Sequence, residues 1–311
     1  MRLGMVGSGN IAFRHLAALR EAEEVEVVAH LSRTPARAEA AAAAFGGTGY
    51  DSLAAFLRGG RPDAVIVTVP PDQHGALELE LIEAGVPFLV EKPLGIDRTP
   101  EAIAERLAGT TLVTAAGYNW RALDTLDAVR RQLAATPPRM VLGRFHVGTP
   151  SAPWWRHEAQ SGGQMLEQAC HLVDLARHLC GTGELLAAAG HHGALPGFED
   201  GDVAGTSAAL FRFGGLPGVV TAAAVLPHGP GAELRLICEG CEIAVTLSGI
   251  EIAGNGETRR IEARANTYAV QNRAFLDAVR SHAPEAVLCT YADALATHRL
   301  CLEAAGRIRQ R

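Results

Sequence analysis

The first twenty residues constrain the fold most, because they read as an apolar strand, a glycine turn and an alanine-rich helix. Gly7, Gly9 and Ala12 give the spacing GxGxxA in that setting. The first glycine permits a tight turn, the second lets a pyrophosphate approach the backbone, and the small alanine lets helix and strand pack closely. The free amides and dipole of the helix N-terminus favour the phosphates. An ordinary strand-to-helix glycine turn is the alternative. The dinucleotide-binding residues expected here are Gly7, Ser8, Gly9, Asn10 and Ile11.

The residues after the second predicted strand, 25–31, indicate which dinucleotide binds. An acidic side chain roughly twenty residues past the glycines would bind the adenosine ribose hydroxyls of NAD. Here the chain reads Ser32-Arg33, with no acid. A hydroxyl beside a guanidinium suits a 2′-phosphate, because arginine binds phosphate with two parallel charged hydrogen bonds. We therefore predict NADP(H) as the preferred cofactor and NAD(H) as the second choice. Arg33 as an ordinary exposed arginine is the alternative.

Further strands alternate with helices along the N-terminal part of the chain. Residues 63–68 form a continuous apolar run, as is typical of a strand buried on both faces, and residues 87–90 and 111–116 predict two more strands. Strands alternating with helices over about 120 residues indicate an α/β fold, a parallel sheet with helices on both faces. Such sheets hold ligands at the carboxyl ends of their strands. The cofactor-binding residues expected there are Val69, Pro70, His74, Glu91 and Lys92.

Beyond residue 121 the pattern changes. The expected elements are a helix at 122–134, a strand at 140–147 and closing helices at 267–281 and 291–310. Residues 185–261 read as short strands separated by glycine turns, which indicates a mostly antiparallel, open sheet. We therefore predict two domains, a dinucleotide-binding domain at residues 1–120 and an α+β substrate-binding or oligomerisation domain at residues 121–311.

Residues 161–181 read as one helix that carries more chemistry than packing requires. Ser161 and Gln164 have capping-box spacing, and Gly181 stands where a helix usually stops. A polar stripe runs between them at steps of four, three and four residues. Its members are Glu167, His171, Asp174 and His178. A carboxylate one turn before an imidazole forms a proton-transfer pair. A stripe that is merely solvated is the alternative.

The composition argues against several classes of partner. A net charge of -6 without a long basic run argues against nucleic acid or an anionic membrane as the main partner. No apolar run reaches the roughly 18 residues that a membrane span needs. Met1 leads at once into a predicted strand, which leaves no room for a secretion signal. We therefore expect a cytoplasmic protein.

Six cysteines are scattered along the chain, which predicts reduced, mostly buried thiols rather than a disulfide framework. Cys238 and Cys241 form a CxxC pair, but no second ligand pair at zinc spacing is obvious nearby. We read this pair as two strands that meet at a turn. A zinc site on the predicted helix 161–181 is not expected either, because Cys170 and His171 point about 100° apart. We expect no metal.

Four motifs, in this order along the chain, resemble the Gfo/Idh/MocA oxidoreductases. They are GxGxxA near the N-terminus, PPDQH after the third predicted strand, EKP after the fourth, and SGGQMLEQACHLVD at mid-chain. The resemblance spans essentially the whole chain. It implies an N-terminal Rossmann domain, a C-terminal α+β domain with a mostly antiparallel sheet, and NAD(P)-dependent oxidation or reduction. The implied substrates are sugars, inositols and related cyclic polyols or ketones.

The same resemblance implies roles for single residues. Lys92 matches the catalytic lysine of the family and His171 its catalytic histidine. Glu167 falls where many members have an aspartate and is expected to be the third catalytic residue. Asn119 lies at the boundary between cofactor and substrate, and we count it with the cofactor-binding residues. The expected substrate-binding residues are Trp120, Arg121, Trp154, Trp155, Arg156 and Asp174, of which the last orients the helix or a neighbouring loop.

The chemistry requires a hydride donor or acceptor and a proton transfer at the oxygen of the reacting carbon. We expect His171 to be the general acid or base, oriented by Glu167 or by a substrate hydroxyl, and Lys92 to stabilise negative charge on the same oxygen. Two other classes stay open: a dinucleotide-binding regulator without turnover, and an NAD-dependent glycosidase that oxidises and later re-reduces its sugar. An open sheet face predicts a homodimer or homotetramer, because such a face must be covered.

Overall fold

The computed structural model describes residues 1–20, 22 and 24–310, and the chain divides into two compact units. The first unit comprises Met1–Ala122 and Asn266–Leu295. The second comprises Leu123–Ala265 and the residues from Ala296 on. Compared with the expected division, residues 121–122 and Asn266–Leu295 also belong to the first unit.

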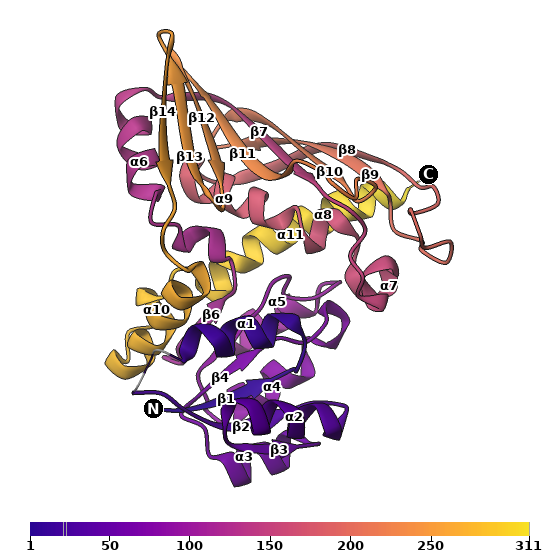
Figure 1. The fold of residues 1–311 in the computed structure, drawn as a ribbon, viewed down its shortest axis with the longest axis vertical. Helices are drawn as coiled ribbons and strands as arrows, with labels where there is room; N and C mark the ends of the chain where they lie inside the picture. The colour runs from indigo at the N-terminus through magenta and orange to yellow at the C-terminus, as the bar shows by residue number, and fades with distance from the viewer. Residues whose placement is uncertain (21, 23, 311) are drawn as a thin grey trace. The chain divides into compact units, whose positions relative to one another are not determined.

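The first unit is built on a six-stranded parallel sheet with the order β3-β2-β1-β4-β5-β6 (Figure 1). Its strands are β1 (Arg2–Val6), β2 (Glu26–Leu31), β3 (Thr48–Tyr50), β4 (Ala64–Val67), β5 (Phe88–Val90) and β6 (Thr114–Ala116). The strand order reverses between β1 and β4, and ligands of such sheets bind outside the carboxyl ends of the strands at that reversal. The α/β fold with an N-terminal Rossmann sheet is confirmed, although β3 is too short and polar to be recognised in the sequence.

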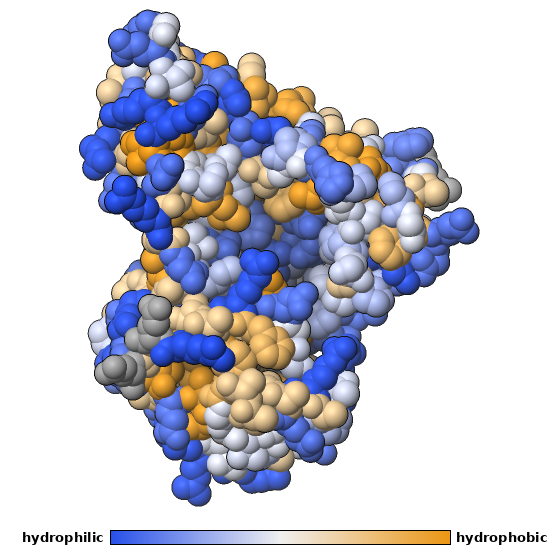
Figure 2. Space-filling view, in the orientation of Figure 1, coloured by the Kyte–Doolittle hydropathy of each residue, from blue (hydrophilic) through white to orange (hydrophobic). Residues whose placement is uncertain are grey.

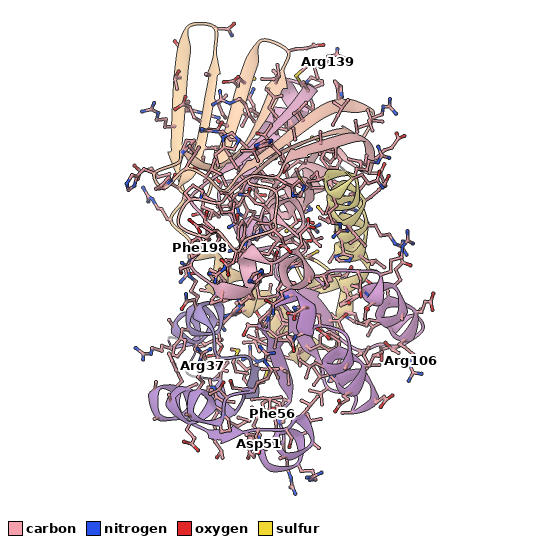
Figure 3. The ribbon with its side chains drawn as sticks, turned by 90° about the vertical axis from the view of Figure 1, so that its right-hand side faces the viewer. Arg37, Asp51, Phe56, Arg106, Arg139 and Phe198 are labelled. Atoms are coloured by element: carbon pink, nitrogen blue, oxygen red, sulfur yellow. The ribbon has the colours of Figure 1, made fainter. Side chains whose placement is uncertain are left out.

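Helices cover both faces of this sheet. They are α1 (Asn10–Leu19), α2 (Pro35–Phe45), α3 (Leu53–Gly60), α4 (Ala76–Glu83), α5 (Thr99–Leu107) and α10 (Thr267–Ser281). Leu16 of α1 and Phe275 of α10 belong to the same buried cluster as Met5 of β1. Gly4 faces the other side of the sheet, where a side chain would overlap the ring of Phe56 on α3. Phe56, labelled in Figure 3, is fully buried. Helix α10 is therefore an integral part of the dinucleotide-type fold.

The second unit is built on an eight-stranded sheet with the order β14-β13-β12-β11-β7-β10-β9-β8. Its strands are β7 (Pro138–His146), β8 (Gly183–His191), β9 (Thr206–Phe213), β10 (Leu216–Ala223), β11 (Gly231–Cys238), β12 (Cys241–Thr246), β13 (Gly249–Gly254) and β14 (Glu257–Glu262). Among the described strands of this sheet only β7 and β10 pair in parallel, so the expected α+β unit with a mostly antiparallel sheet is confirmed. Strand β14 is polar and exposed except at Ile261, and Figure 2 shows hydrophilic residues at this end of the sheet.

The prediction of one helix over residues 161–181 is wrong. The helices of this unit are α6 (Leu126–Ala135), α7 (Glu158–Ser161), α8 (Gln164–Glu167), α9 (Cys170–Cys180) and α11 (Tyr291–Arg309), which begins in the first unit. Gly162 and Gly163 have φ angles of +72° and +84°, which an α-helix does not accept. A second irregularity follows α8, where the N–H of Ala169 donates to the carbonyl of Gln164, five residues back. The capping box is also absent, because the Ser161 hydroxyl accepts the N–H of Gly163 instead.

The CxxC pair occupies the turn that the sequence predicts. Cys238 and Cys241 are paired in register at the ends of β11 and β12. All six cysteines are free thiols, and four of them are buried. Among the residues that the structure describes, no helix is long and apolar enough to cross a membrane, and no cluster of metal-ligating side chains gathers.

His30 on β2 gives the first unit a pH-dependent stability. Its side chain is buried and its Nε2 lies 2.9 Å from the carbonyl oxygen of Gly46. Burial lowers the pKa of His30 below its ordinary 6.5, although the hydrogen bond to Gly46 opposes this. The unfolded chain therefore takes up a proton on His30 before the folded chain does, so stability falls as the pH falls below 6.5.

We predict that the free energy of unfolding falls less steeply with decreasing pH in His30→Gln than in the wild type. Urea unfolding of the wild type and the variant at several pH values from neutrality downward measures it. His191→Gln, at an exposed position on β8, is the control and should keep the wild-type slope. Equal slopes for wild type and His30→Gln would contradict the assignment.

Candidate active site

The glycine turn of the first unit leaves space in front of α1. Gly7 has φ +100°, and a Cβ there would lie 2.6 Å from the carbonyl oxygen of Thr68, so no side chain fits. Gly9 is the N-cap residue of α1, and a Cβ there would meet no described atom within 4 Å. Ala12 is buried against the sheet. The first and third small residues are thus required by the packing of the protein itself. The second keeps the helix N-terminus open, which fits a pyrophosphate.

A pair of hydroxyls lies at the carboxyl ends of β1 and β2. Ser8 Oγ and Ser32 Oγ are 2.9 Å apart, and Ser32 Oγ also accepts the N–H of Thr34 at 3.3 Å. Arg33 follows Ser32 and is exposed. The residues expected to recognise the adenosine ribose are therefore together at the predicted edge of the sheet.

The loop after β4 is braced from inside the unit. The hydroxyl of Thr68 donates to the carbonyl of Val6 at 3.1 Å. Nδ1 of His74 lies 2.6 Å from Oε1 of Glu78, whose other oxygen accepts the N–H of Gly75 at 2.5 Å. Both side chains are almost fully buried. His74 thus fixes the turn into α4, while Val69 and Pro70, both half-buried, keep partly open faces at the edge of the sheet.

The EKP motif follows β5 and joins Glu91, which is buried, to Lys92, which is half-buried. The Lys92–Pro93 peptide bond is cis. Oε2 of Glu91 accepts the backbone N–H of Lys92 at 3.2 Å, and Oε1 lies 3.0 Å from Nε2 of His15 on α1. Glu91 therefore acts as an internal brace, and His15 is a functional candidate that the sequence motifs did not reveal.

The segment after β6 is tied into the first unit. The amide of Asn119 donates to the hydroxyl of Thr267 at 3.3 Å. Arg121 is buried, with its guanidinium 2.6 Å from the carboxylate of Asp293 and 3.2 Å from the carbonyl of Leu288. Trp120 is 2% exposed. The contacts of Arg121 and the burial of Trp120 fit structural roles, and the substrate contacts expected of both residues stay predictions.

In the second unit the residues of the predicted polar stripe contact different neighbouring elements. Asp174 is fully buried and accepts the hydroxyl of Thr297 on α11 at 2.9 Å. Nε2 of His178 accepts from Arg130 on α6 at 2.7 Å, since a guanidinium only donates. Asp174 and His178 therefore fix α9 against other helices. His171, the second residue of α9, remains partly exposed.

Glu167 ends α8 and is held by a tryptophan. Nε1 of Trp155 donates to Oε2 of Glu167 at 2.7 Å. Trp155 is 1% exposed and packs in a small core with Leu195, Val203 and Ala224. The indole thus fixes the position of the Glu167 carboxylate. This burial argues against the direct substrate contact that we expected of Trp155.

The neighbouring residues of that segment are fixed to the loop before β9. Trp154 packs partly buried against the same small core. Arg156 pairs with Asp200 at 3.0 Å and stacks over the ring of Phe198, with the guanidinium carbon 4.9 Å from the ring centre. These contacts order the loop and leave part of Trp154 and Arg156 accessible.

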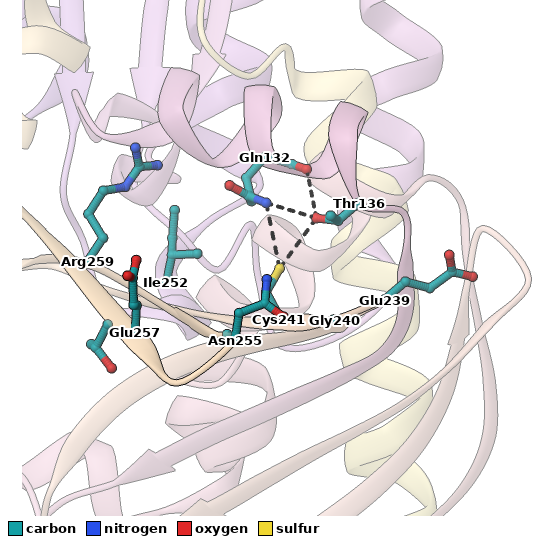
Figure 4. Close-up of a pocket in the computed structure, with 11 residues that line it drawn as sticks. Gln132, Thr136, Glu239, Gly240, Cys241, Ile252, Asn255, Glu257 and Arg259 are labelled. Carbon is teal, nitrogen blue, oxygen red and sulfur yellow. Dashed lines mark hydrogen bonds between the residues drawn. The ribbon is translucent and has the colours of Figure 1, made fainter.

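A separate pocket of about 320 Å³ lies between α6 and strands β12 to β14. The Cys241 thiol lies at its wall (Figure 4). Its Sγ is 3.4 Å from Thr136 Oγ1 and 3.7 Å from Gln132 Nε2. None of the residues expected to bind cofactor or substrate lines this pocket. It is therefore not the site that the motifs indicate.

Models of two protein domains match the chain. Residues 1–109 match a model described as an oxidoreductase family with an NAD-binding Rossmann fold, and residues 132–244 match a model of the GFO/IDH/MocA C-terminal domain. Together the two matches cover more than half of the chain.

Relatives and solved structures agree with these models. Inositol 2-dehydrogenase of Rhizobium meliloti is 30% identical over 58% of this chain and 55% of its own length. The scyllo-inositol 2-dehydrogenase (NAD(+)) of Bacillus subtilis is 28% identical over 70% of this chain and 68% of its own length. The match to the first of these relatives thus spans only about half of its length. A 3-ketoreductase from Actinomadura kijaniata, solved with NADP and TDP-benzene, has a TM-score of 0.85 and 22% identity over 99% of this chain and 97% of that one. At this identity the likeness concerns the fold.

Gly7 and Gly9 make a pair of substitutions that separates folding from cofactor binding. We expect Gly7→Ala to lower the free energy of unfolding by about 1–3 kcal/mol, because of its positive φ and its contact with Thr68. We expect Gly9→Ala to cost less than about 1 kcal/mol but to weaken dinucleotide binding roughly tenfold or more. Urea unfolding and titration of cofactor fluorescence measure the two effects. Wild-type affinity in Gly9→Ala would contradict the placement of the pyrophosphate.

Proposed function

The chain belongs to the Gfo/Idh/MocA family of oxidoreductases, and on this premise we propose that it is an NAD(P)-dependent dehydrogenase or reductase. It transfers a hydride between NADP(H), or NAD(H) as the second choice, and a hydroxyl or carbonyl carbon of a sugar, inositol or related cyclic polyol. The observation that carries this proposal is the open helix N-terminus at Gly9 in the same unit as the braced Glu91-Lys92 pair. The nicotinamide, when bound, supplies or accepts the hydride.

Lys92 and His171 divide the remaining chemistry. Lys92 hydrogen-bonds the reacting oxygen and stabilises the negative charge that develops on it. His171 gives a proton to that oxygen or takes one from it, according to the direction of the reaction. The partial exposure of both side chains supports these roles.

Glu167 orients His171, and the bond from Trp155 to one of its carboxylate oxygens supports this role by fixing the carboxylate. Trp154 and Arg156 are the proposed substrate contacts. The buried side chains of Trp120, Arg121, Trp155 and Asp174 stabilise the units to which they belong.

The catalytic assignment predicts the effect of removing either side chain. His171→Ala and Lys92→Ala should lower turnover on an active sugar or polyol by about 10²–10⁴, while cofactor affinity changes little. Turnover and a fluorescence titration of the cofactor measure the two quantities. His178→Ala, which removes a histidine bonded to Arg130, is the matched control and should keep its turnover. Near-normal turnover in either catalytic variant would refute that assignment.

The cofactor assignment makes its own prediction. Arg33→Ala should lower kcat/KM for NADP(H) by roughly ten- to hundredfold and leave the value for NAD(H) nearly unchanged, because the lost guanidinium would bind only the 2′-phosphate. Arg106→Ala, at an exposed arginine on α5 (Figure 3), is the control. A wild-type preference for NAD(H), or equal losses with both cofactors, would overturn the role of Arg33.

A further inference from the structure

Three polar residues from distant parts of the chain are buried together in the first unit. His15 lies on α1, Glu91 follows β5 and Asn272 lies on α10, and they are 0%, 7% and 1% exposed. Nδ1 of His15 is 2.7 Å from Oδ1 of Asn272, and Nε2 is 3.0 Å from Oε1 of Glu91. A buried polar group without a hydrogen bond destabilises the fold, so each of these contacts should join a donor to an acceptor.

The orientation of Asn272 determines where the proton of His15 lies. The Asn272 amide nitrogen donates to the backbone carbonyl of His15 at 3.3 Å. A flipped amide would set its oxygen against that carbonyl oxygen, and two acceptors repel each other. Oδ1 therefore faces the ring, and because an amide oxygen only accepts, Nδ1 must carry a hydrogen.

The contact between His15 and Glu91 then needs one further proton. With Nδ1 protonated, the proton between Nε2 and Oε1 belongs either to an imidazolium beside a carboxylate or to a carboxylic acid beside a neutral imidazole. The other oxygen of Glu91 accepts the N–H of Lys92, and this hydrogen bond favours the carboxylate. This geometry favours the ion pair over the neutral acid beside a neutral imidazole.

A phenol and two cationic groups surround the pair. The ring of Tyr268 on α10 contacts the His15 ring edge-on, with centres 5.1 Å apart and planes at 82°. Burial raises the pKa of the Tyr268 phenol and the Glu91 carboxylate raises it further, against the opposing effects of Arg14 and Lys92. The phenol is thus neutral where the enzyme would work. Lys92 and Arg14 are the cations near it, and the guanidinium carbon of Arg14 lies 6.0 Å from the centre of the Tyr268 ring.

We propose that His15 and Asn272 are positioning residues for Lys92, because they hold Glu91 as a carboxylate that clamps the backbone of the lysine. This proposal rests on the proposed function, in which Lys92 is the catalytic residue. A protonated His15 also balances the buried negative charge of Glu91. A side chain at Gly117 would overlap the Glu91 carboxylate, so the carboxylate is confined from that side as well.

The charge state is tested without any substrate. In full-length protein labelled with ¹⁵N-histidine, both ring nitrogens of His15 should be protonated at neutral pH. His15→Gln assigns its signals. His30, buried and bonded through one ring nitrogen to a carbonyl, is the internal reference and should be singly protonated. In Glu91→Gln, which has no carboxylate, Nε2 of His15 should lose its proton. A singly protonated His15 in the wild type would overturn the ion pair.

The positioning role is tested by kinetics. Glu91→Gln and Asn272→Leu should lower kcat roughly tenfold or more, with a cofactor dissociation constant close to that of the wild type. Asn272→Asp loses the donor to the His15 carbonyl but keeps an acceptor at Nδ1, whereas Asn272→Leu loses both, so Asn272→Asp should retain more kcat than Asn272→Leu. A role confined to folding would lower stability without this order of kcat values, and that result would overturn the proposal. If the wild type turns over no sugar or polyol, the proposed function fails, while the NMR result still decides the ion pair.

Discussion

The close approach of Gly7 to the backbone of Thr68 is the constraint on which the first unit depends. The N–H of Gly7 donates to the carbonyl of Leu31, and the N–H of Thr68 donates to that of Val6, so the end of β1 is held between β2 and β4. The chain then turns into α1 at the point where the strand order reverses. This crowded turn positions the N-terminus of α1. It also fixes the ends of β2 and β4, from which Ser32 and the loop after β4 follow.

Helix α10 completes the packing of the first unit, because it lies against α1. Without α10, the ring of His15 would lose its partner Asn272, and an unsatisfied buried donor costs about 1–3 kcal/mol. The same helix fills the core beside α1 with Phe275. The cofactor half of the fold therefore depends on residues from near the end of the chain. We infer that packing of the nucleotide fold and order at Lys92 are parts of one interaction network.

The sequence predicts the architecture well because periodicity and glycine turns are local signals. It fails where a neighbour from another element decides. Nothing local tells that Asp174 turns toward Thr297, that Trp155 supports Glu167, or that His15 meets a partner 257 positions away. The break of the predicted helix has a local signal, because Gly162 and Gly163 adopt positive φ angles that an α-helix does not accept. The capping-box spacing of Ser161 and Gln164 points to a helix start at the same place, so the two local signals conflict. Spacing places residues on a stripe, and tertiary packing assigns each of them its role.

The most direct test of the account follows the hydride itself. The full-length protein is incubated with NADPH that carries deuterium on the reactive face of its nicotinamide, together with a panel of keto-sugars and keto-inositols, and the products are analysed by mass spectrometry. The account predicts that deuterium appears on a ring carbon of a reduced product and that oxidised cofactor forms in equal amount. Tight cofactor binding without deuterium transfer to any member of the panel would contradict it and favour a dinucleotide-binding regulator.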